Sequence, residues 1–482
     1  MSTGIAWSLP AALLSVSAAL SHNVSAQCLS QWVPLPGTQN AHVLAMTPWD
    51  TDGPGPAPAG LVVAGSFTSM GGVNATNVAF YEPVAGTWSA LGGGIATTVT
   101  CLTSLPNGDL IAGGINGVAR FVGGAWQAVG SGLDATVLDV VAWPNGDIAA
   151  AGDFSTVGVR RWNGTQWLPL GAGTVGVVAQ LAILAGGDLV AGGAFSSIGG
   201  ALVHHLARWN GTDWQGMGVP PTPGPVVDMT VLANGALVVA TSSGGTTPMN
   251  GVAMRNGATW MVLGTGAGPA WSGGIVGLEV MPDGDLFIAG DWATGYGGAL
   301  SPARLNGAAW ASVGTSFGPV YRVGKMPTGE PVVRDGTSLW RLQSTCPATA
   351  VATSAGCFGS AGLNALAVQS LPWTGGTFRA TATGLHNNTI ALSIFGLSTA
   401  ATPLVSLLPQ GLPTCELNLS TELVLAGVPT AGLVNTEFAV PNSSLLAGFV
   451  LHHQVVALEL NPQNNITAVS STNALALTIG TL

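Results

Sequence analysis

One phrase recurs along the chain and constrains the fold more than any other feature. Residues 159–171 read VRRWNGTQWLPLG, and residues 206–218 read LARWNGTDWQGMG. The second tryptophan of this phrase has a counterpart in every segment of similar sequence. These positions are Trp32, Trp88, Trp126, Trp167, Trp214, Trp260 and Trp310. A chain that repeats one unit must bury each unit against its neighbours, so we expect an array of packed units rather than a single core.

Each unit shows the pattern of four short antiparallel strands. Within residues 175–218, apolar strands at 175–184 and 188–195 flank the turn AGG, and strands at 203–209 and 213–218 flank the turn NGT. Glycine and asparagine favour such turns because they tolerate positive φ angles. A repeat of about 40 to 50 residues with four strands in each unit is typical of a β-propeller.

The two ends of the array predict seven blades. Residues 319–342 supply three strands of a last unit but no fourth, whereas residues 30–37 supply a tryptophan strand without companions. We expect the N-terminal strand to pair with SLWRL at 338–342 and to hide both sheet edges. Residues 347–482 lack the phrase and alternate apolar with polar residues, as in a small antiparallel β-sandwich. The predicted fold is therefore all-β, with a seven-bladed propeller over 27–346 and a sandwich over 347–482.

Charge and the N-terminal segment restrict the compartment and the partners. The chain has 11 Lys and Arg residues and a net charge of -10, which argues against a nucleic-acid partner. Residues 1–26 resemble a signal peptide with cleavage after Ala26. Because the usual basic start is missing, a mis-assigned start codon or an ordinary buried segment remain alternatives. We expect a secreted or cell-surface protein that does not span the membrane and that binds a glycan or an extracellular protein.

Five cysteines fit an exported chain but leave their pairing open. Cys28 and Cys346 flank the two strands that would close the ring, so a disulfide between them would replace a missing covalent turn. Cys357 and Cys415 could form a second disulfide, which would leave Cys101 as a buried thiol. The competing connectivity joins Cys346 to Cys357.

The repeats resemble known propeller families. The segments LVVAGSF at 61–67 and NVAFYEPVAGTWSAL at 77–91, with Tyr81 seven residues before Trp88, are similar to kelch-type propellers. Other units resemble bacterial secreted propellers with ARWNGxxWxxLGxG and LPNGDLxAGGxF phrases, some of which end in a β-domain with a phrase like that of residues 471–480. The resemblance implies a secreted or surface propeller and specifies no ligand. Several units have AGD or AGS where kelch repeats have paired glycines, which weakens any transfer of a kelch partner.

The repeated aromatic and basic residues have a structural interpretation. Exposed tryptophans stack on sugars in carbohydrate binders, but recurrence at one position in each unit favours packing between blades. Four arginines lie six residues before a repeat tryptophan, and a repeated aspartate precedes each of them. We expect these arginines to pair with those aspartates or to stack on an aromatic ring. The residues concerned are Arg120, Arg161, Arg208 and Arg304, with Asp109, Asp147, Asp188 and Asp285.

Catalytic and metal-binding motifs are missing from the sequence. It contains no HExxH, GxSxG, CxxC or DxDxDG pattern, so we predict no cofactor, no metal and a non-enzymatic role. The alternative is a hydrolase or lyase acting on polysaccharide, with Asp153, Glu279 and Asp291 as candidate carboxylates.

A binding surface, if present, is expected on the face that carries the loops between the second and third strands. The candidates there are His204, Asp291, Trp292 and Tyr296. The alternative is that these segments are ordinary solvent-exposed loops.

Overall fold

The protein divides into two compact units in a computed structural model. The larger unit consists of Gln31–Met281 and Asp285–Leu342, and the smaller one contains Gln343–Leu482. The structure describes residues 30–481 except 39–40, 52–58, 106, 116, 144, 155–156, 219, 221–223, 233, 243–250, 265–273, 282–283, 292–300, 307–308, 315–318, 337 and 442. The predicted signal peptide, Cys28, Trp292 and Tyr296 lie outside the described residues.

The described part of the larger unit contains seven four-stranded sheets. The first sheet consists of β2 (His42–Trp49), β3 (Gly60–Ser66), β6 (Val78–Glu82) and β7 (Thr87–Ala90). The second consists of β8 (Val99–Ser104), β9 (Leu110–Gly114), β10 (Gly117–Val122) and β11 (Ala125–Ala128). The third consists of β12 (Val137–Ala142), β13 (Ile148–Gly152), β14 (Val159–Trp162) and β15 (Trp167–Pro169). The fourth sheet consists of β16 (Thr174–Ile183), β17 (Leu189–Ile198), β18 (Leu206–Trp209) and β19 (Trp214–Gly216). The fifth consists of β20 (Val226–Val231), β21 (Leu237–Thr241), β22 (Val252–Asn256) and β23 (Thr259–Val262). The sixth consists of β24 (Ile275–Val280), β25 (Leu286–Gly290), β26 (Ala303–Asn306) and β27 (Ala309–Ser312). A two-stranded hairpin, β4 (Ser69–Met70) and β5 (Val73–Asn74), lies in the chain between β3 and β6 of the first sheet.

The seventh sheet is built from both ends of the larger unit. Its order is β1 (Ser30–Pro34), β30 (Leu339–Ser344), β29 (Pro331–Arg334) and β28 (Arg322–Lys325). The N–H of Leu35 donates to the carbonyl of Leu339 at 2.8 Å. The hydroxyl of Thr38 accepts the N–H of Leu339 at 3.0 Å. The N-terminal strand therefore lies beside the strand of the SLWRL segment, as its sequence predicts.

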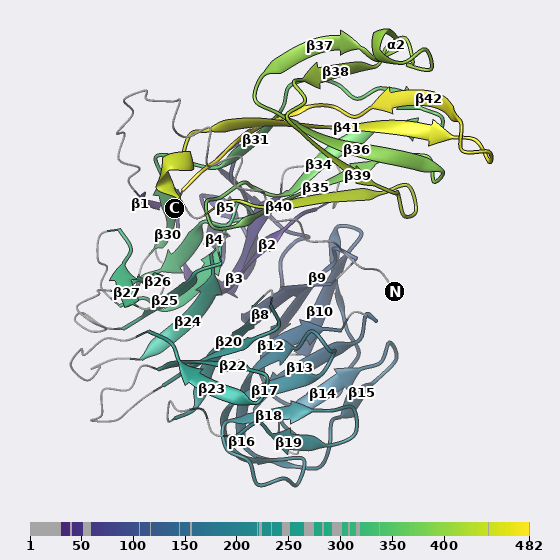
Figure 1. Cartoon of the computed structure of the whole chain (residues 1–482). Coiled ribbons are helices and arrows are strands. Elements are labelled where there is room, and N and C mark those ends of the chain that lie inside the picture. Colours follow the sequence, from purple (N-terminus) through teal and green to yellow (C-terminus); the bar gives the residue numbers. More distant parts are fainter. Residues whose placement is uncertain are drawn as a thin grey trace. The chain divides into compact units, whose positions relative to one another are not determined.

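The first strands of the seven sheets contact one another in cyclic order. Each of β2, β8, β12, β16, β20 and β24 packs against the first strand of the next sheet, and β28 packs against β2. In Figure 1, the sheets from β8 to β19 follow one another along the blue part of the larger unit. Four-stranded antiparallel sheets in this arrangement form a β-propeller.

The core of the propeller lies between consecutive sheets. One apolar cluster joins Val62 and Val78 of the first sheet to Val99 and Leu110 of the second, and the other clusters join later pairs of sheets in the same way. The second strand of most sheets is covered on both faces, which explains apolar sequences such as LFIAG in β25. The repeat thus encodes packing between sheets.

The smaller unit has two main sheets that share one core. The larger sheet has the order β31 (Thr349–Ala352), β43 (Leu475–Thr478), β41 (Val450–Leu460), β36 (Thr389–Gly396) and β39 (Leu423–Gly427), with β42 (Ile466–Ser471) beside β41. The smaller sheet has the order β34 (Ala365–Ser370), β35 (Thr377–Thr383) and β40 (Val434–Ala439). Phe378 and Phe438 of the smaller sheet pack with Phe395 and Leu477 of the larger one. The remaining elements are β32 (Phe358–Gly359), β33 (Gly362–Leu363), β37 (Thr399–Pro403), α2 (Leu404–Leu407), β38 (Glu416–Leu419) and η2 (Ser444–Leu446).

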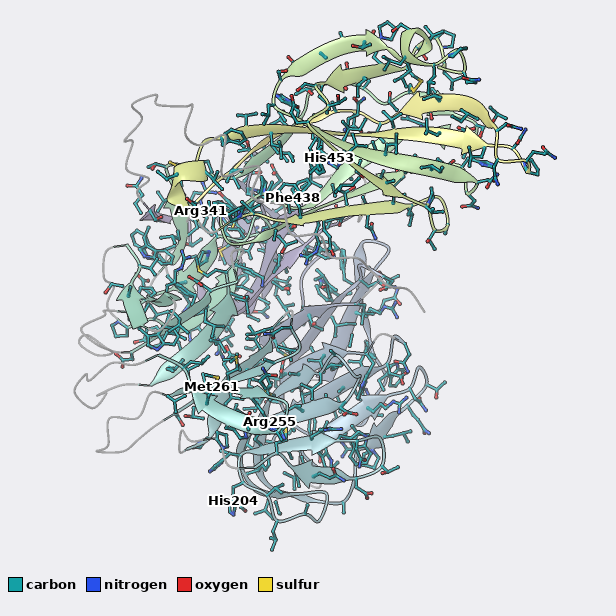
Figure 2. The ribbon with its side chains drawn as sticks, viewed as in Figure 1. His204, Arg255, Met261, Arg341, Phe438 and His453 are labelled. Carbon is teal, nitrogen blue, oxygen red and sulfur yellow. A yellow bond between two sulfur atoms is a disulfide. The ribbon has the colours of Figure 1, made fainter. Side chains whose placement is uncertain are left out.

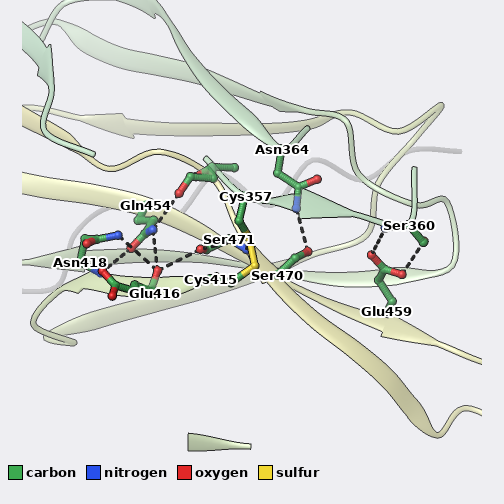
Figure 3. The surroundings of a disulfide bond; sticks show 11 residues. Cys357, Ser360, Asn364, Cys415, Glu416, Asn418, Gln454, Glu459, Ser470 and Ser471 are labelled. Carbon is green, nitrogen blue, oxygen red and sulfur yellow. Dashed lines mark hydrogen bonds between the residues drawn. A yellow bond between two sulfur atoms is a disulfide. The ribbon is translucent and has the colours of Figure 1, made fainter. Parts of the chain in front are cut away.

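A disulfide stabilises the smaller unit. Cys357 and Cys415 are bonded, with their Cα atoms 5.4 Å apart (Figure 3). The alternative pairing of Cys346 with Cys357 is therefore wrong. Cys101 is a buried free thiol, as predicted. The pairing of Cys28 with Cys346 stays a prediction because Cys28 lies outside the described residues.

Candidate functional site

The seven repeat tryptophans are joined to the preceding sheet around the ring. Each indole N–H donates to a backbone carbonyl just after the tryptophan strand of the preceding sheet, at 2.7 to 3.2 Å. The pairs are Trp32 with Val313, Trp88 with Pro36, Trp126 with Leu91, Trp167 with Val129, Trp214 with Leu170, Trp260 with Met217 and Trp310 with Leu263. These indoles are buried or half-buried, so they occupy sheet contacts rather than an open stacking surface.

The repeated arginines bind the repeated aspartates, which confirms that prediction. In each of the four pairs, one guanidinium nitrogen lies 2.6 to 2.9 Å from a carboxylate oxygen. They join Arg120 to Asp109, Arg161 to Asp147, Arg208 to Asp188 and Arg304 to Asp285. The fifth sheet is different because Ala236 takes the place of the aspartate, and Arg255 lies one position out of register, opposite Leu237.

Two of the predicted binding residues lie within the described part of the chain. His204 is exposed in the loop between β17 and β18 and projects outward in Figure 2. Asp291 is exposed directly after β25, and its N–H donates to the carbonyl of Gly274 at 3.2 Å. The strand predicted at 203–209 starts only at Leu206, because His205 has a φ of 65°, which interrupts a strand. The structure does not bring His204 and Asp291 together into one described cavity.

A β-bulge recurs in the first strand of six sheets. The register against the second strand shifts by one residue in each of them, which leaves one unpaired residue. The unpaired residues are Leu44, Thr100, Leu138, Ala179, Val227 and Val276. Three of them, Leu44, Val227 and Val276, line a cavity. The bulges therefore shape the surface at the centre of the ring.

The residue that follows each bulge forms a ring of equivalent positions. Pairing with the fourth residue of the second strand, or with the fifth residue in β3, identifies the members. They are Ala45, Cys101, Asp139, Gln180, Asp228, Gly277 and, by its pairing with Arg334, Arg322. Two acids and one arginine thus lie in one layer of the propeller.

The carboxylates of Asp139 and Asp228 each accept two hydrogen bonds from backbone N–H groups. Asp139 accepts from Val140 at 2.8 Å and from Leu181 of the next sheet at 2.7 Å. Asp228 accepts from Met229 at 2.8 Å and from Leu278 at 2.7 Å in the same way. Burial raises the pKa of each carboxyl to about 7 against the opposing effect of these hydrogen bonds. Each acid therefore links two sheets.

A cavity of about 350 Å³ lies where several first strands meet. Its lining comes from the first, fifth, sixth and seventh sheets, so it lies at the axis of the ring rather than between two neighbours. The lining residues are His42, Leu44, Val227, Ile275, Val276, Tyr321, Arg322 and Arg334. They lie where first strands begin and second strands end, which is the face of the loops that the sequence indicates for binding.

Arg334 is the least expected residue of the cavity. The equivalent positions of the other six sheets hold only alanine or glycine: Ala64, Gly113, Ala151, Gly192, Ala240 and Ala289. Arg334 is 6% exposed, and its Nη1 donates to the carbonyl of Val43 at 2.8 Å. Its guanidinium carbon lies 5.2 Å from the centre of the Tyr321 ring. Burial, and then the charge of Arg322, lower the pKa of Arg334.

The cavity is basic although the chain is acidic. Burial lowers the pKa of His42, with smaller effects from Arg334 and Arg322, so the imidazole is neutral at neutral pH. The two arginines supply the positive charge, and no carboxylate is among the lining residues. The carboxylates proposed for catalysis lie elsewhere: Asp153 is exposed, and Glu279 binds Lys325 at 2.6 Å.

The smaller unit contains buried polar residues of a different kind. His453 is fully buried and stacks on Phe395, with ring centres 4.3 Å apart. Burial lowers the pKa of this histidine to about 3. Glu459 accepts the N–H of Ser360 at 3.0 Å, and Gln454 accepts the N–H of Asn418 at 2.8 Å (Figure 3). These buried groups stabilise the interior of the smaller unit.

Sequence reasoning missed His42, Tyr321, Arg322 and Arg334 because they belong to no motif. The signal that could have found them is departure from the repeat, since PVVRD in the last unit replaces segments such as LVVAG and LIAGG. Within the residues that the structure describes, no group of three His, Cys, Asp or Glu side chains could hold a metal ion. No helix in the described ranges is long and apolar enough to cross a membrane.

The fold and the cavity define a β-propeller with a basic pocket at its axis. Among solved structures, the chain is similar to a streptogramin B lyase, with 11% identity over 66% of this chain and 98% of that one and a TM-score of 0.48. It is also similar to virginiamycin B lyase from Staphylococcus aureus, with 13% identity, 66% and 99% coverage and a TM-score of 0.47. The WD40 propeller domain of Doa1 shows 13% identity, 65% and 96% coverage and a TM-score of 0.45. No function transfers to this chain at such similarity.

No protein-family model matches the sequence, and no curated protein matches it.

Proposed function

We propose that the protein is an exported, non-enzymatic binding module. Residues 1–26 act as a signal peptide, and residues 27–346 form a seven-bladed, kelch-like propeller of a bacterial secreted type. The propeller recognises a glycan or an extracellular protein through the face that holds the cavity. Residues 347–482 form a β-sandwich that serves attachment or sorting.

The cavity at the axis is the observation that carries this proposal. It combines two arginines, a tyrosine and a neutral histidine with apolar walls of Leu44, Val227, Ile275 and Val276. A concave, mainly apolar pocket with a few convergent polar groups is typical of a ligand site. His204, Asp291, Trp292 and Tyr296, on loops of the same face, would form the rim around a larger ligand.

Closure of the ring supports export. A disulfide between Cys28 and Cys346 would join the two strands that complete the seventh sheet, and the smaller unit contains the Cys357–Cys415 disulfide. Disulfides persist in oxidising compartments. The seven repeat tryptophans serve as structural residues at the sheet contacts.

The hydrolase or lyase alternative lacks a comparable observation. Hydrolysis of a glycosidic bond needs two carboxyl groups that face one substrate, at about 5 to 10 Å from each other. The cavity lining offers none, and Asp139 and Asp228 each accept two backbone hydrogen bonds that fix them between sheets.

A binding screen tests the proposal directly. The mature chain from Gln27 is applied to arrays of polysaccharides and extracellular proteins, and product release is measured in the same wells. We expect retention on some members of the arrays without release of product. Turnover of a polysaccharide, or no retention on any array, would overturn the binding-module proposal.

A further inference from the structure

The two arginines of the cavity have donors that the protein does not use. The Nε atoms of Arg322 and Arg334 are buried and have no hydrogen-bond partner in the described structure. Nη1 of Arg334 is occupied by the carbonyl of Val43. The guanidinium group of Arg322 forms no hydrogen bond or ion pair with the residues that the structure describes, although its charge acts to lower the pKa of Asp228. A guanidinium group has five donors, so both side chains retain capacity for an acceptor.

Arg334 occupies a position at which the other six sheets hold only alanine or glycine. A Cβ atom at Gly113 would lie 2.5 Å from the Sγ of Cys101, and one at Gly192 would lie 2.7 Å from a methyl group of Val226. In those sheets the position is too tight for a side chain. The seventh sheet instead accommodates an arginine opposite a second arginine. Two like charges at one point of an acidic protein favour an anion between or beside them.

The walls of the cavity restrict what that anion can be attached to. Four aliphatic side chains line the cavity together with the arginines and with Tyr321, which is 45% exposed. An inorganic ion would gain nothing from these apolar surfaces, whereas a sugar ring presents C–H groups to them. A volume of about 350 Å³ is at the lower end of small-ligand pockets, which admits one sugar residue at the end of a chain.

The net charge of the molecule further selects the ligand. At -10, the protein repels polyanions. A ligand with a single anionic group can reach the arginines without bringing further negative charges to the surface. A planar carboxylate also matches the planar guanidinium group in two parallel hydrogen bonds.

We propose that the axial cavity binds the carboxylate of a terminal uronic acid residue through Arg322 and Arg334. This inference rests on the proposed binding function and specifies its ligand. Tyr321 and the aliphatic side chains contact the sugar ring, and the neutral His42 offers a hydrogen bond to a hydroxyl group. Asp335 interacts electrostatically with Arg334, and Asp228 with Arg322, while Glu279 pairs with Lys325.

Calorimetric titration of the mature full chain tests the assignment with matched ligands. Galacturonate and galactose differ at one carbon, where the first has the carboxylate. We expect galacturonate to bind at least about tenfold more tightly than galactose, which corresponds to roughly 1.4 kcal/mol. Equal binding of the two sugars would overturn the carboxylate assignment, and so would inorganic phosphate binding as tightly as galacturonate.

Substitutions then locate the site. Arg322→Gln should weaken galacturonate binding at least about tenfold, and Arg322→Lys should restore part of the affinity because it keeps the charge. Tyr321→Ala, at a partly exposed ring, should weaken both sugars. Arg379→Gln is the matched control, because Arg379 is an exposed arginine of the smaller unit that pairs with Glu437. Unchanged binding by Arg322→Gln, or an equal loss of affinity in the control, would show that galacturonate does not bind in this cavity.

The remaining outcomes separate this inference from the proposed function. If a peptide that ends in glutamate binds and galacturonate does not, the uronate assignment fails while the binding module stands. If the arrays retain a neutral glycan and galacturonate does not bind, the same conclusion follows. If the arrays retain nothing and galacturonate does not bind, both proposals fail. Circular dichroism of each variant verifies that it is folded.

Discussion

At the residue scale, the departures from the repeat carry more information than the repeat itself. A tryptophan that returns in every unit is explained by contacts that every unit makes. Arg334 has no such explanation, because its six counterparts are alanine or glycine. Its hydrogen bond to Val43 and its stacking on Tyr321 place it at the one cavity described on the axis.

The indole hydrogen bonds lead to a prediction about stability. Trp214 is 4% exposed and donates to the carbonyl of Leu170 at 2.7 Å, while its cross-strand neighbour Trp209 is half-buried with its ring centre 5.5 Å away. Trp214→Phe removes ring volume and leaves a buried carbonyl without this donor. It should lower the free energy of unfolding by about 1 to 3 kcal/mol more than Trp209→Phe does.

Chemical denaturation of both variants, followed by circular dichroism, measures the difference. Trp209→Phe is the matched control, since it removes the same atoms from the facing ring. Equal losses in the two variants would mean that the hydrogen bond between the sheets contributes nothing measurable.

At the residue scale, the repeated arginine–aspartate pairs could be predicted from the sequence, but the residues of the axial cavity could not. Arg161 and Asp147 could be matched because both recur at fixed spacing. Arg322 and Arg334 could not, since their closeness depends on the curvature that brings the first strands to one axis. The loop between the second and third strands makes His204 a candidate, and the structure places it at an exposed position outside the cavity lining.

At the element scale, the bulged first strand is the device that joins sheets. Each bulge breaks the regular ladder, and in two sheets the next residue is an aspartate that accepts its own strand's N–H and one from the next sheet. These bulges could not be predicted, because Leu138 and Val227 continue the apolar pattern of a regular strand.

Asp139 leads to a prediction about pH. Burial raises its pKa to about 7 in the folded protein from the ordinary value of 3.8. Between these values the folded protein holds more protons than the unfolded chain, so the free energy of unfolding falls as the pH rises from about 4 to 7 and then levels off. Asp139→Asn should remove the contribution of Asp139 to this slope and should cost about 1 to 3 kcal/mol at pH 8, where an amide oxygen can satisfy only one of the two N–H groups.

Denaturation curves at pH 5 and pH 8 measure the slope. Asp153→Asn, at an exposed residue directly after β13, serves as the control. The interpretation is wrong if Asp139→Asn shows the pH dependence of the unaltered protein.

At the scale of the whole molecule, the seventh sheet decides whether the ring is closed. β1 covers the edge of β30, and Trp32 reaches the carbonyl of Val313 in the sixth sheet at 2.8 Å. The sequence predicted this pairing from two incomplete halves, one at each end of the array. The sequence did not predict the cavity at the axis, because the residues that line it come from several repeats.

Removal of β1 should open the larger unit. A chain that starts at Gly37 loses Trp32 and exposes the edge of β30, so we expect its melting temperature to fall by at least about 5 °C and the protein to self-associate. A chain that starts at Ser30 is the control, because it also lacks Cys28 but keeps the strand. Calorimetry and size-exclusion chromatography should separate the two chains, and identical behaviour would show that β1 does not close the ring.

The indole hydrogen bonds all point the same way around the ring. Every sheet gives one donor to the sheet before it and offers one carbonyl to the sheet after it, including the sheet assembled from both ends. Duplication of one unit would add one donor and one acceptor and leave none unmatched. The indole hydrogen bonds alone therefore set no limit on the number of units in such a ring.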